Sequence, residues 1–353
     1  MKTKTILFPT FFSLALLLAG CNDEKGNHPA QAKWKKLGLD GKVINEMQFS
    51  GSSLYVATAT GLFKVQVNTM DTDFIPIGFE GKNVEAIQVL AEEALVVSIY
   101  DKSGAEPPAL YKTSDDGATW LLLENNFGGN GAEPVFDLEV HPNNENVLYA
   151  TGFSVVAKSL DQGHTWVPVY GDWGGFATGI SVVEINRKDE NEVWAGGQGA
   201  IENGFLVRTK NDADWDSWSD LVENPTVVKE ITFSPANKEQ VFVGFEGALL
   251  KTTDGGTHWQ TLIESEENRF YFGIGIRDGD AKRVYAGGWL KTSGQQPLIL
   301  YVSETGGDSW SEVKFPAESY GGILELQIKQ EESKDILYLG LDKGGVYEVT
   351  FLR

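Results

Sequence analysis

The stretch Thr113-Ser114-Asp115-Asp116-Gly117-Ala118-Thr119-Trp120 decides the fold, because the chain repeats it at intervals. The shared residues of the further copies are Ser159, Asp161, Gly163, Thr165 and Trp166; Thr252, Asp254, Gly256, His258 and Trp259; and Ser303, Thr305, Gly307, Ser309 and Trp310, with a more eroded copy between Thr209 and Trp218. An Asp side chain accepts hydrogen bonds from turn amides, Gly supplies a positive φ, and the Trp that follows buries a large ring. The pattern therefore predicts a recurring hairpin turn followed by a strand.

A second repeat consists of short apolar segments, each preceded by a polar turn. There are seven of them, at 54–58, 95–100, 147–151, 193–197, 241–245, 284–288 and 336–340. Short strands at even spacing, without a sustained helical period, predict an all-β repeat array. Sharing residues 34–353 among seven units leaves about 46 residues for each, the length of a four-stranded propeller blade. We therefore predict one domain over residues 33–353, a single seven-bladed β-propeller of four-stranded antiparallel blades.

The aromatic residues ahead of the outer strands predict how the ring closes. Six units carry one, namely Phe74, Trp120, Trp166, Trp218, Trp259 and Trp310. The seventh unit, 322–353, ends before an aromatic residue of this kind, whereas Trp34 lies near the other end of the chain, ahead of the first unit. Pairing between the first and last segments would remove an open sheet edge. We expect the N-terminal strand around Trp34 to complete the last blade.

The N-terminus is interpreted as a targeting segment and set apart from the fold. Two lysines precede an apolar run at 6–18 that is too short to span a bilayer comfortably. The sequence Leu-Ala-Gly-Cys that ends at Cys21 resembles the lipobox of bacterial lipoproteins. The resemblance implies a signal peptide over 1–20, a lipid on Cys21, a flexible tether over 21–32, and a place in the bacterial cell envelope, at the outer membrane or cell surface. The alternative is an ordinary signal peptide that happens to contain a cysteine.

Composition excludes several kinds of partner and site. The chain has 29 Lys and Arg against 50 Asp and Glu, a formal charge of −21, and nucleic acid would need a basic surface instead. Cys21 is the only cysteine, so a disulfide or a cysteine-based zinc site is not available. The four histidines, His28, His141, His164 and His258, fall in the tether or in turns. We expect no metal site and no cofactor, and a membrane contact only through the lipid on Cys21.

The repeated turn resembles the Asp-box, or bacterial neuraminidase repeat. Similar proteins include sialidases, xyloglucanases, sortilin-type receptors and the photosystem II assembly factor, so the resemblance implies a propeller without selecting an activity. In blades ordered from centre to rim, the turns after the first and third strands share one face, and ligands usually bind at the other. We therefore interpret Asp115, Asp161 and Asp254 as turn residues, not as catalytic acids or calcium ligands.

Sialidase activity is not expected from the arginines. Resemblance to sialidases would require three arginines that converge on a substrate carboxylate, and this chain has six in total. Arg187, Arg277 and Arg283 fall in turns on the face opposite to the expected ligand face. Only Arg269 is well placed to contact a ligand. The Arg-Ile-Pro motif of sialidases is also absent, the nearest string being Phe-Ile-Pro at 74–76.

The loops expected on the ligand face carry aromatic residues beside polar ones, the usual equipment for stacking on sugars or anchoring a protein. The candidate ligand-binding residues are Trp173, Phe176, Arg269, Tyr271, Trp289 and Tyr320. Trp289 is placed in a loop after the second strand of the sixth blade. The alternative is that these rings fill gaps between blades.

The innermost strands repeat an acid at one aligned position in four blades. The acids are Glu46, Asp137, Glu230 and Glu325, with Ala86, Val182 and Gly273 in the other blades. Carboxylates crowded at a channel mouth would raise one another's pKa or recruit a cation. The alternative is that each acid accepts hydrogen bonds from loop amides of its own blade.

Two functions follow. The first is a lipid-anchored, non-enzymatic propeller that binds a protein or glycan, as an assembly or surface-capture factor. The second is a carbohydrate-active hydrolase or lyase that uses a pair of inner-strand acids. Against the second, xyloglucanases resembling this fold are usually built from two propellers, and one is predicted here.

Overall fold

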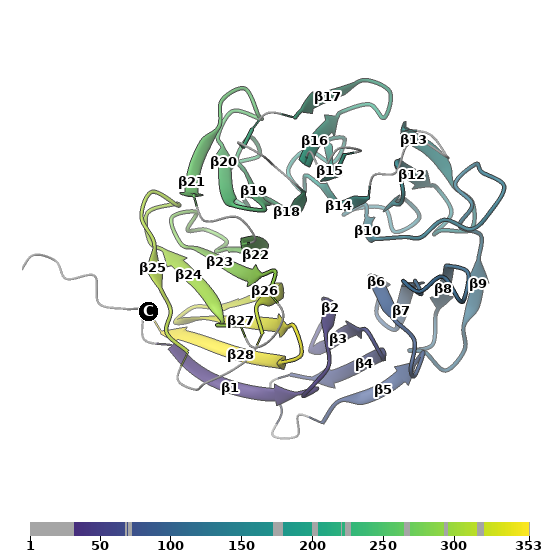
Figure 1. Ribbon diagram of the computed structural model, residues 1–353, viewed down its shortest axis with the longest axis horizontal. Helices are drawn as coiled ribbons and strands as arrows, with labels where there is room; N and C mark the ends of the chain where they lie inside the picture. The colour runs from purple at the N-terminus through teal and green to yellow at the C-terminus, as the bar shows by residue number, and fades with distance from the viewer. Residues whose placement is uncertain are drawn as a thin grey trace, which may run out of the picture.

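The computed structural model describes residues 32–67, 69, 73–171, 179–199, 204–219, 221–222, 227–264, 269–292, 296–315 and 321–352. These residues form seven four-stranded antiparallel sheets and contain no helix. The sheets stand as blades around a central axis, with one strand of each lining the centre (Figure 1). The seven-bladed β-propeller predicted from the repeats is confirmed.

Each blade runs from the centre to the rim. The innermost strands are β2 (Ile44–Ser50), β6 (Val84–Ala91), β10 (Asp137–Val140), β14 (Ile180–Ile185), β18 (Val228–Phe233), β22 (Arg269–Ile276) and β26 (Ile323–Glu331). The second strands are β3 (Ser53–Thr58), β7 (Ala94–Ile99), β11 (Leu148–Thr151), β15 (Val193–Gln198), β19 (Val241–Phe245), β23 (Val284–Leu290) and β27 (Lys334–Leu341). These second strands coincide with the apolar segments of the sequence and are almost wholly buried, because blades pack against both of their faces.

The third and fourth strands form the outer half of each blade, and the fourth strand is the more exposed of the two. The third strands are β4 (Gly61–Gln66), β8 (Ala109–Thr113), β12 (Val155–Ser159), β16 (Gly204–Thr209), β20 (Ala248–Thr252), β24 (Ile299–Ser303) and β28 (Gly345–Leu352). The outermost strands are β5 (Ile75–Gly78), β9 (Leu121–Leu123), β13 (Val167–Gly171), β17 (Trp215–Trp218), β21 (Gln260–Glu264), β25 (Ser311–Glu312) and β1 (Ala32–Gly38). Short edge strands of this kind limit pairing with other chains.

The ring closes by pairing of the first described strand with the last. β1 lies antiparallel to β28, with Ala32 opposite Phe351 and Trp34 opposite Val349. The Trp34 ring packs edge-on against Phe315 at a centroid distance of 4.7 Å. The predicted closure is confirmed, although β1 begins at Ala32, the residue at which the tether was expected to end.

The repeated turns join the third and fourth strands and are held by their aspartates. Asp115 accepts hydrogen bonds from the backbone N–H of Thr119 at 2.8 Å and from the hydroxyl groups of Thr119 and Thr113. These bonds lower the pKa of Asp115, the Thr119 hydroxyl most of all. Gly117 has φ 85°, a conformation that side chains with a Cβ rarely adopt. Asp161 and Asp254 make the equivalent bonds, so all three carboxylates are engaged in their turns.

The same turns also tie each blade to the one before it. Asp116 in the second blade reaches back to the first, where Lys64 Nζ lies 2.5 Å from its Oδ2 and the Tyr55 hydroxyl donates to its Oδ1. Asp212 makes the same pair of contacts with Lys158 and Tyr149. The repeat therefore encodes contacts between blades as well as a turn within each blade.

One repeat position was assigned wrongly from the sequence. Trp215, not Trp218, opens the outer strand β17. Asn211 takes the place of the turn aspartate and accepts hydrogen bonds from the backbone N–H groups of Ala213 and Asp214 in the same turn. Trp218 instead ends β17 and stacks on Trp194 of the same blade, with ring centroids 5.1 Å apart. The turn that begins at Thr209 is one residue shorter than the other copies, so the sequence alignment of the repeats assigned the wrong tryptophan to the start of the strand.

Candidate functional site

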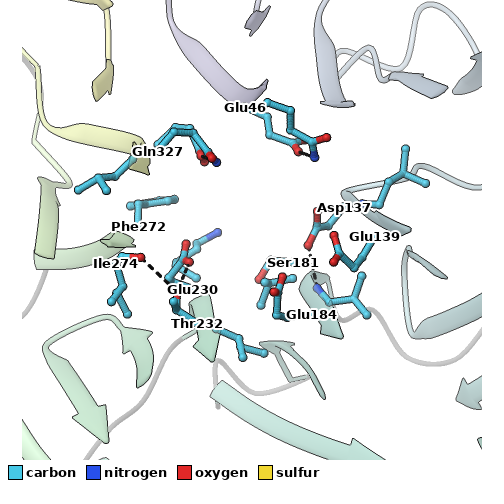
Figure 2. A pocket seen from close by; sticks show the side chains of 18 of the residues that line it. Glu46, Asp137, Glu139, Ser181, Glu184, Glu230, Thr232, Phe272, Ile274 and Gln327 are labelled. Atoms are coloured by element: carbon cyan, nitrogen blue, oxygen red, sulfur yellow. Dashed lines mark hydrogen bonds between the residues drawn. The ribbon is translucent and has the colours of Figure 1, made fainter. Parts of the chain in front are cut away.

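The seven innermost strands surround a cavity of about 1260 Å³ on the axis of the ring. Its wall carries carboxyl groups from several blades, and Figure 2 shows Glu46, Asp137, Glu139, Glu184 and Glu230 around the space. A concave site with convergent polar groups is the usual place for a ligand in a propeller. This cavity and its mouth are the candidate functional site.

The four aligned acids, here called the acid ring (Glu46, Asp137, Glu230 and Glu325), occupy one position of the blade. Each pairs with the equivalent residue of its second strand, Ala57, Thr151, Gly244 and Gly340 respectively. In β2, β18 and β26 this position directly follows a β-bulge. Ala86, Val182 and Gly273 hold the same position in the other blades. The four acids therefore occupy equivalent backbone positions on four inner strands, and all four line the cavity.

The hydrogen bonds of the acid ring fall into two kinds. Glu46 accepts from the backbone N–H of Ile87, and Asp137 from that of Val183, in each case across to the next blade. Glu230 accepts from the Thr232 hydroxyl, and Glu325 from the Gln327 amide, along its own strand. The alternative in which each acid accepts hydrogen bonds from loop amides of its own blade is wrong for Glu46 and Asp137, because each of them accepts a backbone N–H from an inner strand of the next blade.

Four further carboxyl-bearing residues line the cavity, Glu85, Glu139, Glu184 and Asp278, and two of them belong to the inner strands β10 and β14 but were not predicted as site residues. Glu139 follows Asp137 by two residues in β10, and Glu184 follows Val182 by two in β14. Glu139 is 6% exposed and lies 3.3 Å from the Arg187 guanidinium. The signal was present in the sequence, since alternate residues of a strand share one face.

Burial governs the electrostatics of these groups. Desolvation raises the pKa of Asp137 to about 7. Burial, opposed by Arg187 and reinforced by Asp137, raises the pKa of Glu139 to about 8. Burial also raises the pKa of Glu325 to about 8, with a smaller contribution from Asp137. The pKa values of Glu46 and Glu230 are raised well above the ordinary range, first by burial and then by other members of the acid ring. A share of these carboxyl groups therefore carries protons near neutral pH and can donate hydrogen bonds.

Aromatic rings flank the mouth of the cavity, where the inner strands begin. Phe136, directly before β10, lines the cavity and packs edge-on against Phe153, which is 40% exposed. Phe272 holds the equivalent place in β22 and packs against Trp289 at 6.0 Å. The Lys229 ammonium lies 5.4 Å from the Phe272 ring.

The predicted ligand-binding residues have mixed outcomes. Trp173, Phe176 and Tyr320 lie outside the described residues, as does Cys21. Tyr271 is fully buried and packs in the core with Phe242 and Leu249, so it does not belong to the ligand face. Its neighbour Phe272 faces the cavity instead, because a bulge between Tyr271 and Gly273 sets which residues point to the channel.

The other two predicted ligand residues are engaged within the protein. Arg269 begins β22 and donates a hydrogen bond to the Tyr301 hydroxyl at 3.2 Å. Trp289 lies within β23, not in a loop, and its indole N–H donates to Asp342 at 3.3 Å.

Other kinds of site find no support in the part of the chain that the structure describes. Of the arginines there, only Arg187 lines the cavity, so no three of them converge on a substrate carboxylate. Over the same residues, no group of three or more His, Cys, Asp or Glu side chains could hold a metal ion. A helix suited to crossing a membrane is likewise not found among them.

Comparisons with known proteins indicate the fold more clearly than the activity. No family model matches the chain. A xyloglucanase from Hypocrea jecorina (strain QM6a) is 23% identical over 258 residues, which cover 71% of this chain and 28% of the relative. The chloroplastic photosystem II stability/assembly factor HCF136 of Oryza sativa subsp. japonica is 22% identical over 138 residues, 38% of this chain and 31% of the relative. The chain thus spans less than a third of the length of either relative.

A solved structure of YCF48 bound to a D1 peptide is similar in fold. It matches with a TM-score of 0.63 and 12% identity, covering 92% of this chain and 97% of the other. The match therefore includes nearly the whole of both chains. It supports the propeller architecture, and at this identity the likeness concerns the fold alone.

Proposed function

We propose that this protein is a binding module that holds a segment of another protein at the mouth of its central cavity, and that it is not an enzyme. The observation that carries the proposal is the pair of aromatic clusters around Phe136 and Phe272, on different blades at the rim of one cavity. Aromatic anchors beside polar groups are typical of protein-binding surfaces. The fold shared with peptide-bound YCF48 supports the same function.

Glycoside hydrolysis is the second candidate, favoured by a specific observation. Eight carboxyl-bearing residues line the cavity, and a hydrolase needs two carboxyl groups at a suitable separation, one as acid and one as base or nucleophile. The sequence similarity to a xyloglucanase supports this alternative. The fold does not choose between them.

The two functions predict opposite responses to substitution. In a binding module, Phe272→Ala should weaken binding to hits from a peptide array at least about tenfold, since aromatic anchors contribute roughly 2 kcal/mol or more. In a hydrolase, Asp137→Asn or Glu230→Gln should abolish release of reducing ends from a glycan panel while glycan binding persists. Leu122→Ala, at an exposed apolar position on the outer strand β9, is the matched control. Sugar release by the wild-type protein would overturn the binding-only function.

We further propose that the repeat is an Asp-box repeat and that the chain is a lipoprotein anchored in the bacterial envelope through Cys21. The sequence Leu-Ala-Gly-Cys that ends at Cys21 supports this anchor. Labelling with a radioactive fatty acid should mark the wild-type protein in cells, whereas Cys21→Ser should remove the label and release the protein from the membrane fraction. Equal labelling of both would exclude the lipid.

A further inference from the structure

We propose that the segment bound at the mouth inserts one lysine or arginine side chain into the channel. There the carboxylates of the acid ring would bind the positively charged group of that side chain. This inference rests on the proposed protein-binding function and names the chemistry of the partner. The flanking apolar residues of the same segment would lie on the aromatic clusters of Phe136 and Phe272.

The acid ring acts as one electrostatic site. Asp137 and Glu325 both raise the pKa of Glu46, and the same two residues raise that of Glu230. The carboxyl groups of all four residues belong to the lining of one cavity, to which they come from four different blades. A cation in this cavity would be attracted by several of them together.

The fold does not need an acid in every blade at this position. Ala86, Val182 and Gly273 occupy the equivalent place, and their strands keep the same bulge and pairing. Glu46 and Asp137 also link neighbouring blades, because they accept backbone N–H bonds from the next inner strand. Within the described part of the chain, Glu230 and Glu325 accept bonds only from side chains of their own strands, so a ligand explains these two acids better than folding does.

Three of the four described cations that line the cavity interact with groups outside the acid ring. Lys102 lies 3.0 Å from Glu85 at the mouth, and Arg187 is paired with Glu139. Lys229 lies over Phe272, and the charges that act on it most are Glu85, Lys102, Glu246 and Lys291, none of them in the acid ring. The charged groups that line the cavity outside the acid ring are Glu85, Lys102, Glu139, Glu184, Arg187, Lys188, Lys229 and Asp278.

The geometry favours an organic cation over a metal ion. The ring carboxyl groups do not come together as a metal site in the described part of the protein. A guanidinium or ammonium group carries several N–H donors and spans a wider set of acceptors than a bare ion. Among the described residues, Glu230 and Glu325 each show one hydrogen bond, at Oε1, which leaves Oε2 of each to accept from such a donor.

Binding would be coupled to proton release. In the empty channel, part of the ring is protonated at neutral pH, because burial disfavours the charged form. The entering cation favours the carboxylate, so the carboxyl O–H bond breaks and the proton leaves to solvent. Affinity should therefore increase as the pH rises from 6 to 8.

The test compares two blocked peptides, acetyl-Gly-Phe-Arg-Phe-Gly-amide and the same peptide with citrulline, a neutral isostere, in place of arginine. Titration calorimetry at pH 7 in two buffers of different ionisation enthalpy should show at least a tenfold preference for the arginine peptide, with proton release. The double variant Glu230→Gln/Glu325→Gln should lose the preference and most of the proton release. Glu124→Gln, at an exposed position after β9, should keep both.

The outcomes separate this inference from the proposed function. Equal affinity for the two peptides, or a preference that survives in the double variant, would refute the cation site. If neither blocked peptide binds while array peptides without basic residues do, the inference fails and the binding function stands. If no peptide binds at all, the binding function itself fails. Circular dichroism of the double variant verifies that it is folded, which we expect because glutamine removes buried charge.

Discussion

Asp335→Asn should lower the free energy of unfolding by about 3–5 kcal/mol, the cost of leaving buried charges without their partner. Asp335 is 0% exposed and forms an ion pair with Arg277, while Arg283 Nη1 lies 3.4 Å from its second oxygen. The Tyr285 hydroxyl donates to the same oxygen at 2.8 Å. Asparagine keeps the shape but removes the charge that balances the two guanidinium groups. Urea unfolding at pH 7, followed by tryptophan fluorescence, measures the loss.

The control for this variant lies in the same cluster but in solvent. Glu304 pairs with Arg283 at 2.6 Å and is 59% exposed. Glu304→Gln should therefore cost less than about 1 kcal/mol, as exposed ion pairs do. Similar losses in the two variants would mean that burial of Asp335 does not set the energy of the cluster.

Acidification should stabilise the protein, opposite to the usual behaviour of paired carboxylates. Asp137, Glu139 and Glu325 have a pKa of about 7 to 8 in the folded protein, against ordinary values of 3.8 and 4.5. Between about pH 4 and 8 the folded state then binds more protons than the unfolded state, so stability falls as the pH rises through this window. Below about pH 4 these carboxyl groups are protonated in both the folded and the unfolded state, so their contribution to stability no longer changes with pH.

The size of the effect depends on how far water reaches the cavity. Glu139 is almost fully buried, whereas the acid ring is half-buried and cavity water weakens its shifts. A net difference of one proton corresponds to about 1.4 kcal/mol per pH unit, so we expect a gain of about 2–3 kcal/mol between pH 8 and pH 6. Urea midpoints measured at a series of pH values give the slope. Glu325→Gln should reduce the slope and Glu124→Gln should not; a flat or rising profile from pH 6 to 8 would contradict the account.

The architecture could be predicted because the same turn-and-strand pattern recurs along the sequence. Three copies of the turn combine a hydrogen-bonding Asp, a Gly of positive φ and a large apolar Trp. The buried second strands are largely apolar runs. Local sequence and final fold agree at these positions. Ring closure could also be predicted, because the last unit lacked the aromatic residue of an outer strand and Trp34 lay ahead of the first unit.

The site was less predictable because its geometry depends on bulges and on strand alternation. The bulge between Tyr271 and Gly273 turns Tyr271 into the core and Phe272 to the cavity, and the sequence alone does not show it. Glu139 and Glu184 were not predicted because they lie two residues after the aligned position of the inner strand, and only the aligned position was compared between blades. Phe153 was missed because a single phenylalanine in a short loop carries no repeat pattern.

The pairing of β1 with β28 also determines when the ring can be completed. Ala32 is among the first described residues to be synthesised and its partner Phe351 among the last. Contacts so distant in sequence carry the largest loop-closure cost and form late. Six blades can assemble from neighbouring segments, but the seventh must wait until both strands are available. Until that moment the edge of β28 and the ring of Trp34 remain uncovered, and this is the stage of folding at which the chain is most exposed to aggregation.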